Sequence, residues 1–327
     1  MLQALHEITD ASLLAYNTLG LDVRAERLIT ARSEDELAAA LTRYPDALVL
    51  GGGSNTVFRG DVAGTVVRPC IPGIDRVGDQ LVVGGGEDWH GLVSHSVELG
   101  LAGLENLALI PGSAGAAPVQ NIGAYGRELA DVLVSVRAWH RPSGNFVELT
   151  AGECRFSYRD SLFRGTDDFV ITGLVLALST RFEPCIDHPD LRRAFPVPPS
   201  TPAEVMEAIM EIRRRKLPDP AVTGNVGSFF KNPVVPVEVA EALRKTNPGL
   251  PAWELGDSIK LSAGWLIETV GMKGRWQGGA RVSPGHALVI VNAGGATPDD
   301  ILELAARIRS AVKDKFGIVL EVEPRLV

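Results

Sequence analysis

Residues 47–55 read Ala47-Leu48-Val49-Leu50-Gly51-Gly52-Gly53-Ser54-Asn55. The four apolar residues predict a buried strand, and three glycines at its end let backbone amides adopt positive φ and approach a phosphate closely. The segment therefore predicts either a phosphate-binding loop or an ordinary tight turn between strands. It is not a Walker loop, because no Gly-Lys-Ser/Thr follows, and it is not a clear GxGxxG dinucleotide fingerprint.

A second glycine-rich segment spans residues 103–126, and small residues dominate its second half. Backbone of this kind can lie flat against an extended cofactor, with Ser113, Gln120 and Asn121 available for hydrogen bonds. Either segment alone could be a structural loop. Two of them in one domain favour a bound dinucleotide.

Helix caps and apolar runs around these segments predict alternating helices and strands. Ser33 followed by Glu36 predicts a capping box that opens a helix reaching about Tyr44. A helix is expected at about 88–99, and strands are expected at about 65–67, 80–83, 133–149 (a hairpin) and 169–178. From about residue 184 to 199 the chain is proline-rich and reads as an irregular loop and linker.

A new domain is expected to begin with a helix at Thr201-Pro202-Ala203-Glu204 that reaches Arg215. An N-cap, a proline at the first helical position and a glutamate three residues after the cap are strong helix-start signals. Thr297 starts a helix in the same way, with an apolar stripe at Ile301, Leu304, Ile308, Ala311 and Val312. Other expected elements are helices at about 237–244 and 263–270 and strands at about 287–291 and 317–322.

The composition is that of an acidic globular protein. With 327 residues, 45% of them hydrophobic and 22% charged, the chain predicts two or three packed domains, and its net charge of -8 argues against a nucleic-acid surface. Cys70, Cys154 and Cys185 are odd in number and far apart, which disfavours a disulfide framework and a zinc site. Residues 1–7 lack a basic segment followed by an apolar core, and no stretch approaches ~18 uninterrupted apolar residues, so neither secretion nor membrane spanning is expected. We therefore expect a cytoplasmic protein without nucleic acid, membrane or metal. We also expect a monomer, a state that no feature of the sequence fixes.

Six segments together carry a resemblance to a known family: 48–55, 103–128, 158–163, 224–233, 260–267 and 320–325. In this order, over nearly the whole chain, the sequence resembles the UDP-N-acetylenolpyruvoylglucosamine reductases, in the longer subclass with a substrate-covering loop. The resemblance implies an α+β protein with a vanillyl-alcohol-oxidase-like (PCMH-like) FAD-binding fold. Its two α/β subdomains would be residues 1–66 with about 304–327, and residues 67–200, and residues 201–303 would form an α+β substrate-binding domain.

The same resemblance implies FAD as cofactor, NADPH as reductant and a nucleotide-sugar substrate whose enolpyruvyl group is reduced to give UDP-N-acetylmuramate. We expect the FAD to be noncovalent, because neither glycine-rich segment contains the histidine or cysteine that related oxidases often use for attachment. The NADPH preference rests on the family alone, since no motif reads a 2'-phosphate. The expected FAD contacts are Gly51, Gly52, Gly53, Ser54, Asn55, Thr56, Pro111, Gly112, Ser113, Gly115, Ala116, Gln120, Asn121, Gly123, Ala124, Tyr125 and Gly126.

Reduction of an enol ether conjugated to a carboxylate needs a hydride at the methylene carbon, a proton at the adjacent carbon and positive charge near the enolate formed between them. Arg159 matches the family residue that supplies this charge, and its alternative is a salt bridge with Asp160 or Glu153. Ser228 matches the family's proton donor. A serine is a weak acid, so this role predicts a cation or hydrogen-bond relay nearby, whereas the alternative is a turn serine.

Glu323 matches the family's C-terminal glutamate, which stabilises the enol form or positions a water on the carboxylate. The sequence departs from the family pattern at Pro324, which removes a backbone donor and biases Glu323 toward an extended conformation, so local strand pairing is expected to differ. Glu321 is expected to be an exposed strand carboxylate.

The resemblance also implies five substrate contacts: Tyr158, His188, Lys216, Asn232 and His286. His188 stands about where the longer subclass has a tyrosine that closes over the uridine diphosphate. Lys216 could equally be a cation that favours a helix C-terminus by ~0.3 to 1 kcal/mol. His286 could be an ordinary surface residue at a strand start.

Two other functions compete with this one. An oxidase of alcohols or lactones would share the fold. A non-catalytic nucleotide-sugar binding protein would not explain two cofactor segments alongside Arg159, Ser228 and Glu323.

Overall fold

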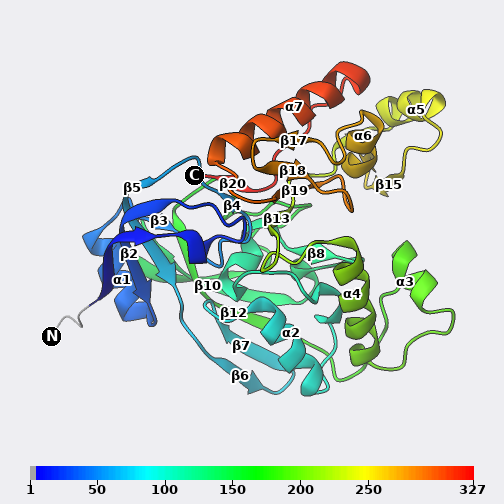
Figure 1. Cartoon of the computed structure of the whole chain (residues 1–327). Coiled ribbons are helices and arrows are strands. Elements are labelled where there is room, and N and C mark those ends of the chain that lie inside the picture. Colours follow the sequence, from blue (N-terminus) through cyan, green and yellow to red (C-terminus); the bar gives the residue numbers. More distant parts are fainter. Residues whose placement is uncertain (1–4) are drawn as a thin grey trace. The chain divides into compact units, whose positions relative to one another are not determined.

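The computed structural model describes residues 5–327 (Figure 1). These residues divide into two units. Unit 1 contains the described part of residues 1–11 together with 25–53 and 62–214, and unit 2 contains residues 12–24, 54–61 and 215–327. Residues 304–327 thus belong to the same unit as residues 215–303. The three-part division that the sequence suggests stays a prediction.

Unit 1 is built on two larger sheets, with strand orders β1-β2-β5-β3 and β11-β10-β12-β7-β6, and also contains the two-stranded sheet of β8 (Gly123–Ala124) and β9 (Arg127–Glu128). The pairs β2·β5 and β3·β5 are parallel, whereas the five-stranded sheet is antiparallel throughout. The strands are β1 (His6–Ser12), β2 (Arg24–Ala31), β3 (Leu48–Val49), β5 (Val62–Pro69), β6 (Ile74–Val77), β7 (Gln80–Gly84), β10 (Leu133–His140), β11 (Asn145–Thr150) and β12 (Phe169–Ala177).

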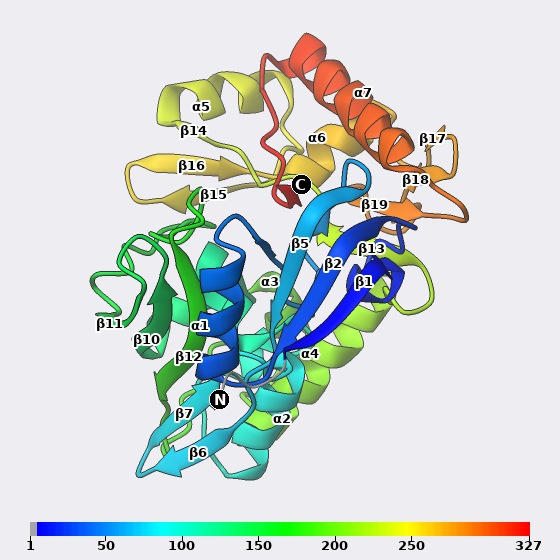
Figure 2. The ribbon, with the colours of Figure 1, turned by 90° about the vertical axis from the view of Figure 1, so that its left-hand side faces the viewer.

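Three helices bury their apolar faces against these sheets. Helix α1 (Glu34–Arg43) lies between them in Figure 2, and Leu37 shares a core with Val67 of β5 and Val170 of β12. Helices α2 (Trp89–Glu98) and α4 (Pro202–Lys216) pack on the five-stranded sheet, where Trp89 and Ile209 belong to one core. The helix starts predicted at Ser33 and Thr201 are confirmed.

The capping box predicted at Ser33 is only half formed. Ser33 accepts a hydrogen bond of 3.2 Å from the backbone N–H of Glu36. The Glu36 carboxylate instead accepts from the backbone N–H of Arg32, at 2.7 Å. Both side-chain bonds still supply acceptors to backbone N–H groups at the helix start that have no hydrogen-bond partner within the helix.

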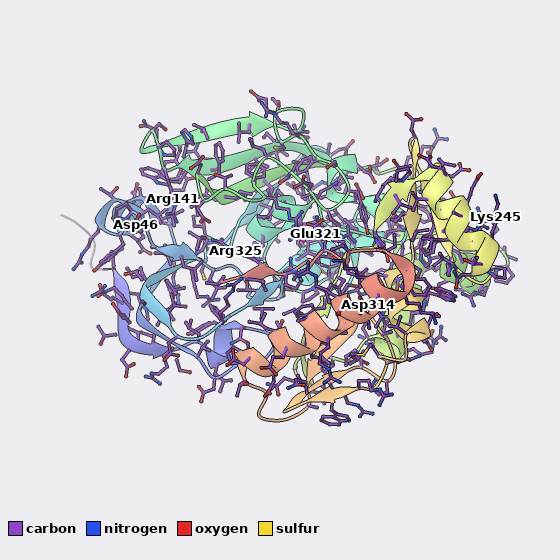
Figure 3. All side chains as sticks on the ribbon, turned by 90° about the horizontal axis from the view of Figure 1, so that it is seen from above. Asp46, Arg141, Lys245, Asp314, Glu321 and Arg325 are labelled. Atoms are coloured by element: carbon purple, nitrogen blue, oxygen red, sulfur yellow. The ribbon has the colours of Figure 1, made fainter. Side chains whose placement is uncertain are left out.

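Arg141, which follows β10, ties the β10–β11 hairpin to the residues before β3 (Figure 3). Its guanidinium donates to the carbonyl oxygens of Pro45 and Ala47, on either side of Asp46, at 2.5 and 2.6 Å. This contact anchors the strand that leads into Gly51.

Unit 2 contains three small sheets, ordered β13-β19-β18-β17, β14-β16-β15 and β20-β4. Helix α7 packs against β17 and β18 (Figure 1). The elements are β4 (Thr56–Val57), β13 (Gly224–Ser228), β14 (Val234–Pro236), α5 (Val237–Thr246), β15 (Ala252–Leu255), β16 (Ser258–Leu261), α6 (Ala263–Thr269), β17 (Trp276–Gln277), β18 (Ala280–Val282), β19 (Val289–Asn292), α7 (Pro298–Phe316) and β20 (Arg325–Leu326).

The helix predicted after Thr297 is confirmed in detail. Thr297 and Asp300 form a reciprocal capping box, and the helix ends at Gly317, whose φ of 69° suits glycine. The predicted stripe is buried at Ile301, Leu304, Ile308 and Val312, while Ala311 is half-buried.

Two predictions of local structure were wrong. The expected strand at 317–322 is extended and buries Ile318 and Leu320, but only Val322 forms a bridge, and the regular strand is β20. An extended segment can bury alternate side chains without forming the backbone hydrogen bonds of a sheet, so this burial does not make residues 317–322 a strand. The region expected to be irregular contains α3 (Pro189–Ala194), which His188 caps.

Candidate active site

The two glycine-rich segments meet within unit 1. A Cβ added to Gly52 would lie 2.8 Å from the Cα of Gly112, and one added to Gly51 would lie 2.9 Å from Ser113 Oγ. Real Cβ atoms do not approach backbone this closely, so glycine is required for the two segments to touch. Gly52 and Ala116 are exposed. This arrangement fits a dinucleotide lying along backbone rather than two unrelated turns.

The second segment contains an unusual concentration of positive φ angles. Leu109, Asn121 and Tyr125 have φ of 56°, 44° and 50°, and Arg159 has 53°. Only six non-glycine residues of the described chain have positive φ, so these four are most of them. Such conformations cost of order 1 kcal/mol each and gather at functional sites.

Arg159 lies beside the second glycine-rich segment. It belongs to a tight turn in which Ser157 and Asp160 exchange two backbone hydrogen bonds of 3.1 and 3.2 Å. Its Nη2 donates to the carbonyl oxygen of Gly123 at 2.6 Å, and its guanidinium lies 5.4 Å from the ring centroid of Tyr158. The guanidinium predicted to act on substrate is thus held by a residue predicted to contact FAD.

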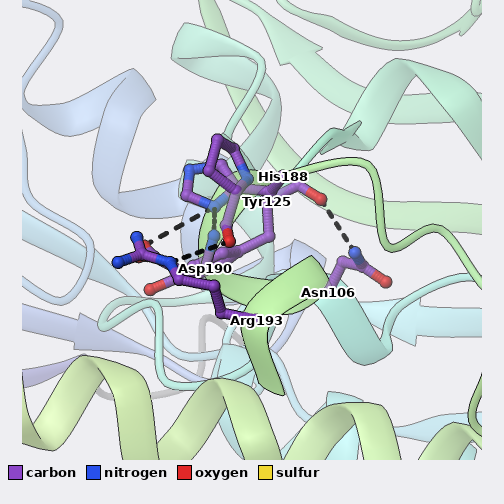
Figure 4. Close-up of polar contacts among 6 residues, drawn as sticks. Asn106, Tyr125, His188, Asp190 and Arg193 are labelled. Carbon is purple, nitrogen blue, oxygen red and sulfur yellow. Dashed lines mark hydrogen bonds and ion pairs between the residues drawn. The ribbon is translucent and has the colours of Figure 1, made fainter. Parts of the chain in front are cut away.

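His188 also reaches this segment (Figure 4). Its ring packs edge-on against Tyr125 with centroids 4.9 Å apart. Its Nδ1 accepts from the backbone N–H of Asp190 at 3.2 Å and so caps α3, while Arg193 pairs with Asp190 at 2.7 Å. The structure therefore gives His188 an N-capping role that the sequence did not suggest.

Cys185 lies outside the glycine-rich segments in sequence but touches the end of the second one in space. Its Sγ is 3.7 Å from the carbonyl oxygen of Gly126, and the side chain of Asn106 donates to the carbonyl oxygen of Cys185 at 2.8 Å. Asn106 also donates to the carbonyl oxygen of Tyr125 (Figure 4). Burial raises the pKa of the Cys185 thiol, which keeps it protonated and weakly nucleophilic near neutral pH.

Arg213 was missed as a site candidate. The structure places this residue of α4 near Tyr125, and its Nη2 donates to the carbonyl oxygen of Leu109 at 3.2 Å. Burial lowers the pKa of Arg213, because removal from water disfavours the charged guanidinium. Arg213 lies four residues after Ile209 and therefore on the apolar face of α4. A charged residue at such a position is the sequence feature that could have identified it.

Within unit 2, backbone pairing brings Glu323 next to the strand of Ser228. Glu323 donates its N–H to the carbonyl oxygen of Phe229 at 3.0 Å, Val322 bridges Phe230, and Lys231 donates to the carbonyl oxygen of Glu321 at 3.0 Å. Glu321 is exposed, as expected, and its carboxylate pairs with Lys231 Nζ at 2.8 Å.

The Ser228 hydroxyl is half-buried and makes no hydrogen bond to any described residue. The relay that a serine acid requires is therefore not formed by a direct hydrogen bond in this structure. Beyond Glu323, Arg325 donates to the carbonyl oxygen of Asn55 at 2.9 Å, and β20 runs parallel to β4. The chain end thus joins the strand of Ser228 to Asn55, the last residue of the first glycine-rich segment.

Lys216 and His286 also come together in unit 2. The carbonyl oxygen of Lys216 lies 3.8 Å from where a Cβ of Gly285 would be. Burial, and then the positive charge of Lys216, lower the pKa of His286, whose Nδ1 accepts from the backbone N–H of Leu288 at 3.3 Å. Asn232 Oδ1 accepts from the N–H of Ala263 at 3.0 Å, which leaves its NH2 group without a partner among the described residues.

Comparison with known proteins decides the family. A UDP-N-acetylenolpyruvoylglucosamine reductase of Bordetella pertussis is 46% identical over 328 residues, which span 96% of this chain and 93% of that protein. This chain belongs to the UDP-N-acetylenolpyruvoylglucosamine reductase family. A member from Cupriavidus pinatubonensis is 47% identical, over 94% of this chain and 96% of its own length.

Two family models match separate parts of this reductase. One, described as an FAD binding domain, matches residues 25–150 and so spans both glycine-rich segments, in agreement with FAD as cofactor. The other, the C-terminal domain of UDP-N-acetylenolpyruvoylglucosamine reductase, matches residues 219–327 and includes Ser228 and Glu323. Arg159 and Lys216 lie outside both matches.

Solved structures confirm the fold expected for this reductase. The enzyme of the same name from Thermus caldophilus has a TM-score of 0.70 at 28% identity, covering 99% of this chain and 98% of its own. 6-Hydroxy-D-nicotine oxidase from Arthrobacter nicotinovorans shares the fold, with a TM-score of 0.57 at 13% identity over 98% of this chain and 87% of its own. The α+β, FAD-binding fold class predicted from the sequence is therefore confirmed.

Within residues 5–327, no helix has the length and apolar character needed to cross a membrane. The same residues contain no group of three or more His, Cys, Asp or Glu side chains that could hold a metal ion.

Proposed function

We propose that this chain reduces the enolpyruvyl group of UDP-N-acetyl-3-O-(1-carboxyvinyl)-glucosamine, giving UDP-N-acetylmuramate for peptidoglycan synthesis, with noncovalent FAD and with NADPH as reductant. The observation that carries this proposal is the meeting of two glycine-rich segments at Gly52 and Gly112, with Arg159 hydrogen-bonded to Gly123 of the same cofactor segment. We further propose that the protein acts as a monomer in the cytoplasm.

The FAD, when bound and reduced by NADPH, supplies the hydride that the methylene carbon of the substrate needs. Arg159 then has the task of stabilising negative charge. Its guanidinium pairs with the substrate carboxylate, where the enolate charge collects, because its planar fork matches a carboxylate in a bidentate way. The bond to Gly123 supports this role by fixing one Nη of the guanidinium in place.

Ser228 donates the proton to the carbon adjacent to the methylene group. Its hydroxyl has no hydrogen-bond partner among the described residues, so binding substrate would not break an internal bond. Glu323, which pairs with the neighbouring Phe229, stabilises the enol form or positions a water on the substrate carboxylate. Tyr158, His188, Lys216, Asn232 and His286 contact the nucleotide sugar.

An anaerobic titration tests this function. The purified protein should be yellow, NADPH should bleach the flavin, and the enolpyruvyl sugar nucleotide should restore the colour. UDP-N-acetylglucosamine, which lacks the enolpyruvyl group, serves as the matched control and should leave the flavin reduced. A colourless protein would indicate a nucleotide-sugar binding protein, and bleaching by an alcohol or lactone would indicate an oxidase.

A further inference from the structure

Strand β13 contains an irregularity immediately before Ser228. Asn225 pairs with Val291 of β19, whereas Ser228 pairs with Val289. Regular antiparallel pairing from Asn225 would put residue 227 opposite Val289, so β13 contains one extra residue. Side chains alternate between the faces of a strand, and one inserted residue therefore decides on which face the Ser228 hydroxyl lies.

The side chain of Asn225 holds this bulge. Gly227, inside the bulge, has a φ of 70°, and its N–H donates to Asn225 Oδ1 at 2.9 Å. An amide that leaves the ladder must find another partner when it is buried. Asn225, only 4% exposed, provides that partner from two residues away in the same strand.

Two further hydrogen bonds set the orientation of the Asn225 amide. Its Nδ2 donates to the carbonyl oxygens of Pro218 at 3.1 Å and Thr223 at 2.9 Å. Because carbonyl oxygens only accept, the nitrogen must face them and the oxygen must face Gly227. The backbone of Asn225 is bonded to Thr18 on both sides. Its N–H donates to the carbonyl oxygen of Thr18 at 2.8 Å, and its carbonyl oxygen accepts from the Thr18 hydroxyl at 2.7 Å.

We propose that Asn225 is a positioning residue for Ser228: its oriented amide stabilises the bulge that presents the Ser228 hydroxyl to the substrate carbon. This inference rests on the proposed role of Ser228 as proton donor. Asn225 itself is buried and is not expected to touch substrate.

The first test is Asn225→Asp in the FAD-loaded enzyme. The variant keeps an oxygen for the Gly227 N–H but turns a second oxygen toward the carbonyls of Pro218 and Thr223. Flavin reduction by NADPH should stay within about twofold of wild type. Flavin reoxidation by the enolpyruvyl substrate should slow at least about tenfold, a part of the ~10² to 10⁴-fold that a general acid contributes. The solvent isotope effect on reoxidation should increase.

Asn292→Asp is the matched control, because it makes the same chemical change one strand away. Asn292 lies on β19 opposite Gly224, and its side chain bonds to the carbonyl oxygen of Gly20 and to the N–H groups of Gly294 and Ala296. It also links three backbone groups but does not touch the bulge. This variant should lose stability without separating the two half-reactions.

The double variant Ser228→Ala with Asn225→Asp separates positioning from general support. If Asn225 acts only through Ser228, the double variant should reoxidise no more slowly than Ser228→Ala alone.

Fully additive losses, or equal slowing of both half-reactions by Asn225→Asp, would overturn the inference. A rate of flavin reoxidation in Asn225→Asp equal to that of the wild type would also overturn it. Normal reoxidation by Ser228→Ala would instead remove the proposed donor, and the inference with it. If Asn225→Asp does not fold, Asn225→Ser takes its place with the same readouts and outcomes.

Discussion

The backbone N–H of Glu323 donates a 3.0 Å hydrogen bond to the carbonyl oxygen of Phe229, the residue after Ser228. Two residues predicted to handle the same substrate are thus fixed relative to each other by main chain, which side-chain motion does not disturb. Glu321 and Arg325, labelled in Figure 3, lie two residues to either side of Glu323, and each makes its own backbone bond, to Lys231 and Asn55. The assignment of the family role to Glu323 rather than Glu321 stays a prediction.

Ser228→Ala should separate the two half-reactions. Flavin reduction by NADPH should remain nearly unchanged, because no proton passes to the sugar substrate in that step. Reoxidation by the enolpyruvyl substrate should slow by ~10² to 10⁴-fold, the usual contribution of a general acid. Stopped-flow absorbance of the flavin measures both rates.

Ser228→Cys is the companion variant and should recover part of the lost rate, since a thiol is a stronger acid than a hydroxyl. A loss below about tenfold in Ser228→Ala would mean that water or another residue donates the proton. Equal slowing of both half-reactions would show that Ser228 supports the flavin site instead.

Gly52→Ala should weaken FAD retention and lower the stability of the holoenzyme. The added Cβ would lie 2.8 Å from Gly112 Cα, so one glycine-rich segment must move, and overpacking of this kind costs roughly 1–3 kcal/mol. Gly152→Ala is the control, because no atom lies within 4 Å of its added Cβ. Thermal melting and flavin fluorescence after gel filtration measure the two effects. Equal behaviour of the two variants would contradict the tight contact.

Acid precipitation should release all of the flavin into the supernatant. Cys185 lies beside Gly126, but burial raises the pKa of its thiol and so disfavours the thiolate that attachment would need. Cys185→Ser should release the same amount as wild type. Flavin that remains in the wild-type pellet and appears in the supernatant of Cys185→Ser would identify a covalent link to this residue.

Holoenzyme stability should fall as the pH decreases below about 6.5, the ordinary pKa of histidine. Burial lowers the pKa of His286 in the folded state, so the unfolded chain binds the proton more readily. The neutral His286 side chain contributes fully to the free energy of unfolding when the pH is above the pKa of histidine in the unfolded chain. This contribution is lost as the pH falls toward the lower pKa of the folded state, and it amounts to about 1.4 kcal/mol for each pH unit by which the two pKa values differ. Urea unfolding between pH 5 and 8 at constant FAD measures it.

His286→Asn should flatten this pH dependence, because an amide does not titrate. Some slope should remain, since burial also lowers the pKa of His90. An unchanged slope in His286→Asn would contradict the assignment.

The sequence by itself determined the features whose partners are close along the chain. Ser33 and Thr297 start their helices as predicted, because each cap bonds backbone three residues away. The glycine-rich segments were also recognisable, since positive φ and close approach are demands on single residues. Motifs in family order then pointed to Arg159 and Ser228.

Only the tertiary structure decided how these parts meet. A strand was predicted at 317–322, but a strand ladder depends on which distant segment offers hydrogen-bond partners. Here residues 229–231 offer them only to residues 321–323. In the same way, nothing local to Cys185 indicates Gly126, and nothing local to Ser228 indicates that β13 shifts its register against Val289 of β19. Strand register and loop docking are set by contacts between residues far apart in sequence, and a one-residue change in register reverses the face on which a side chain lies.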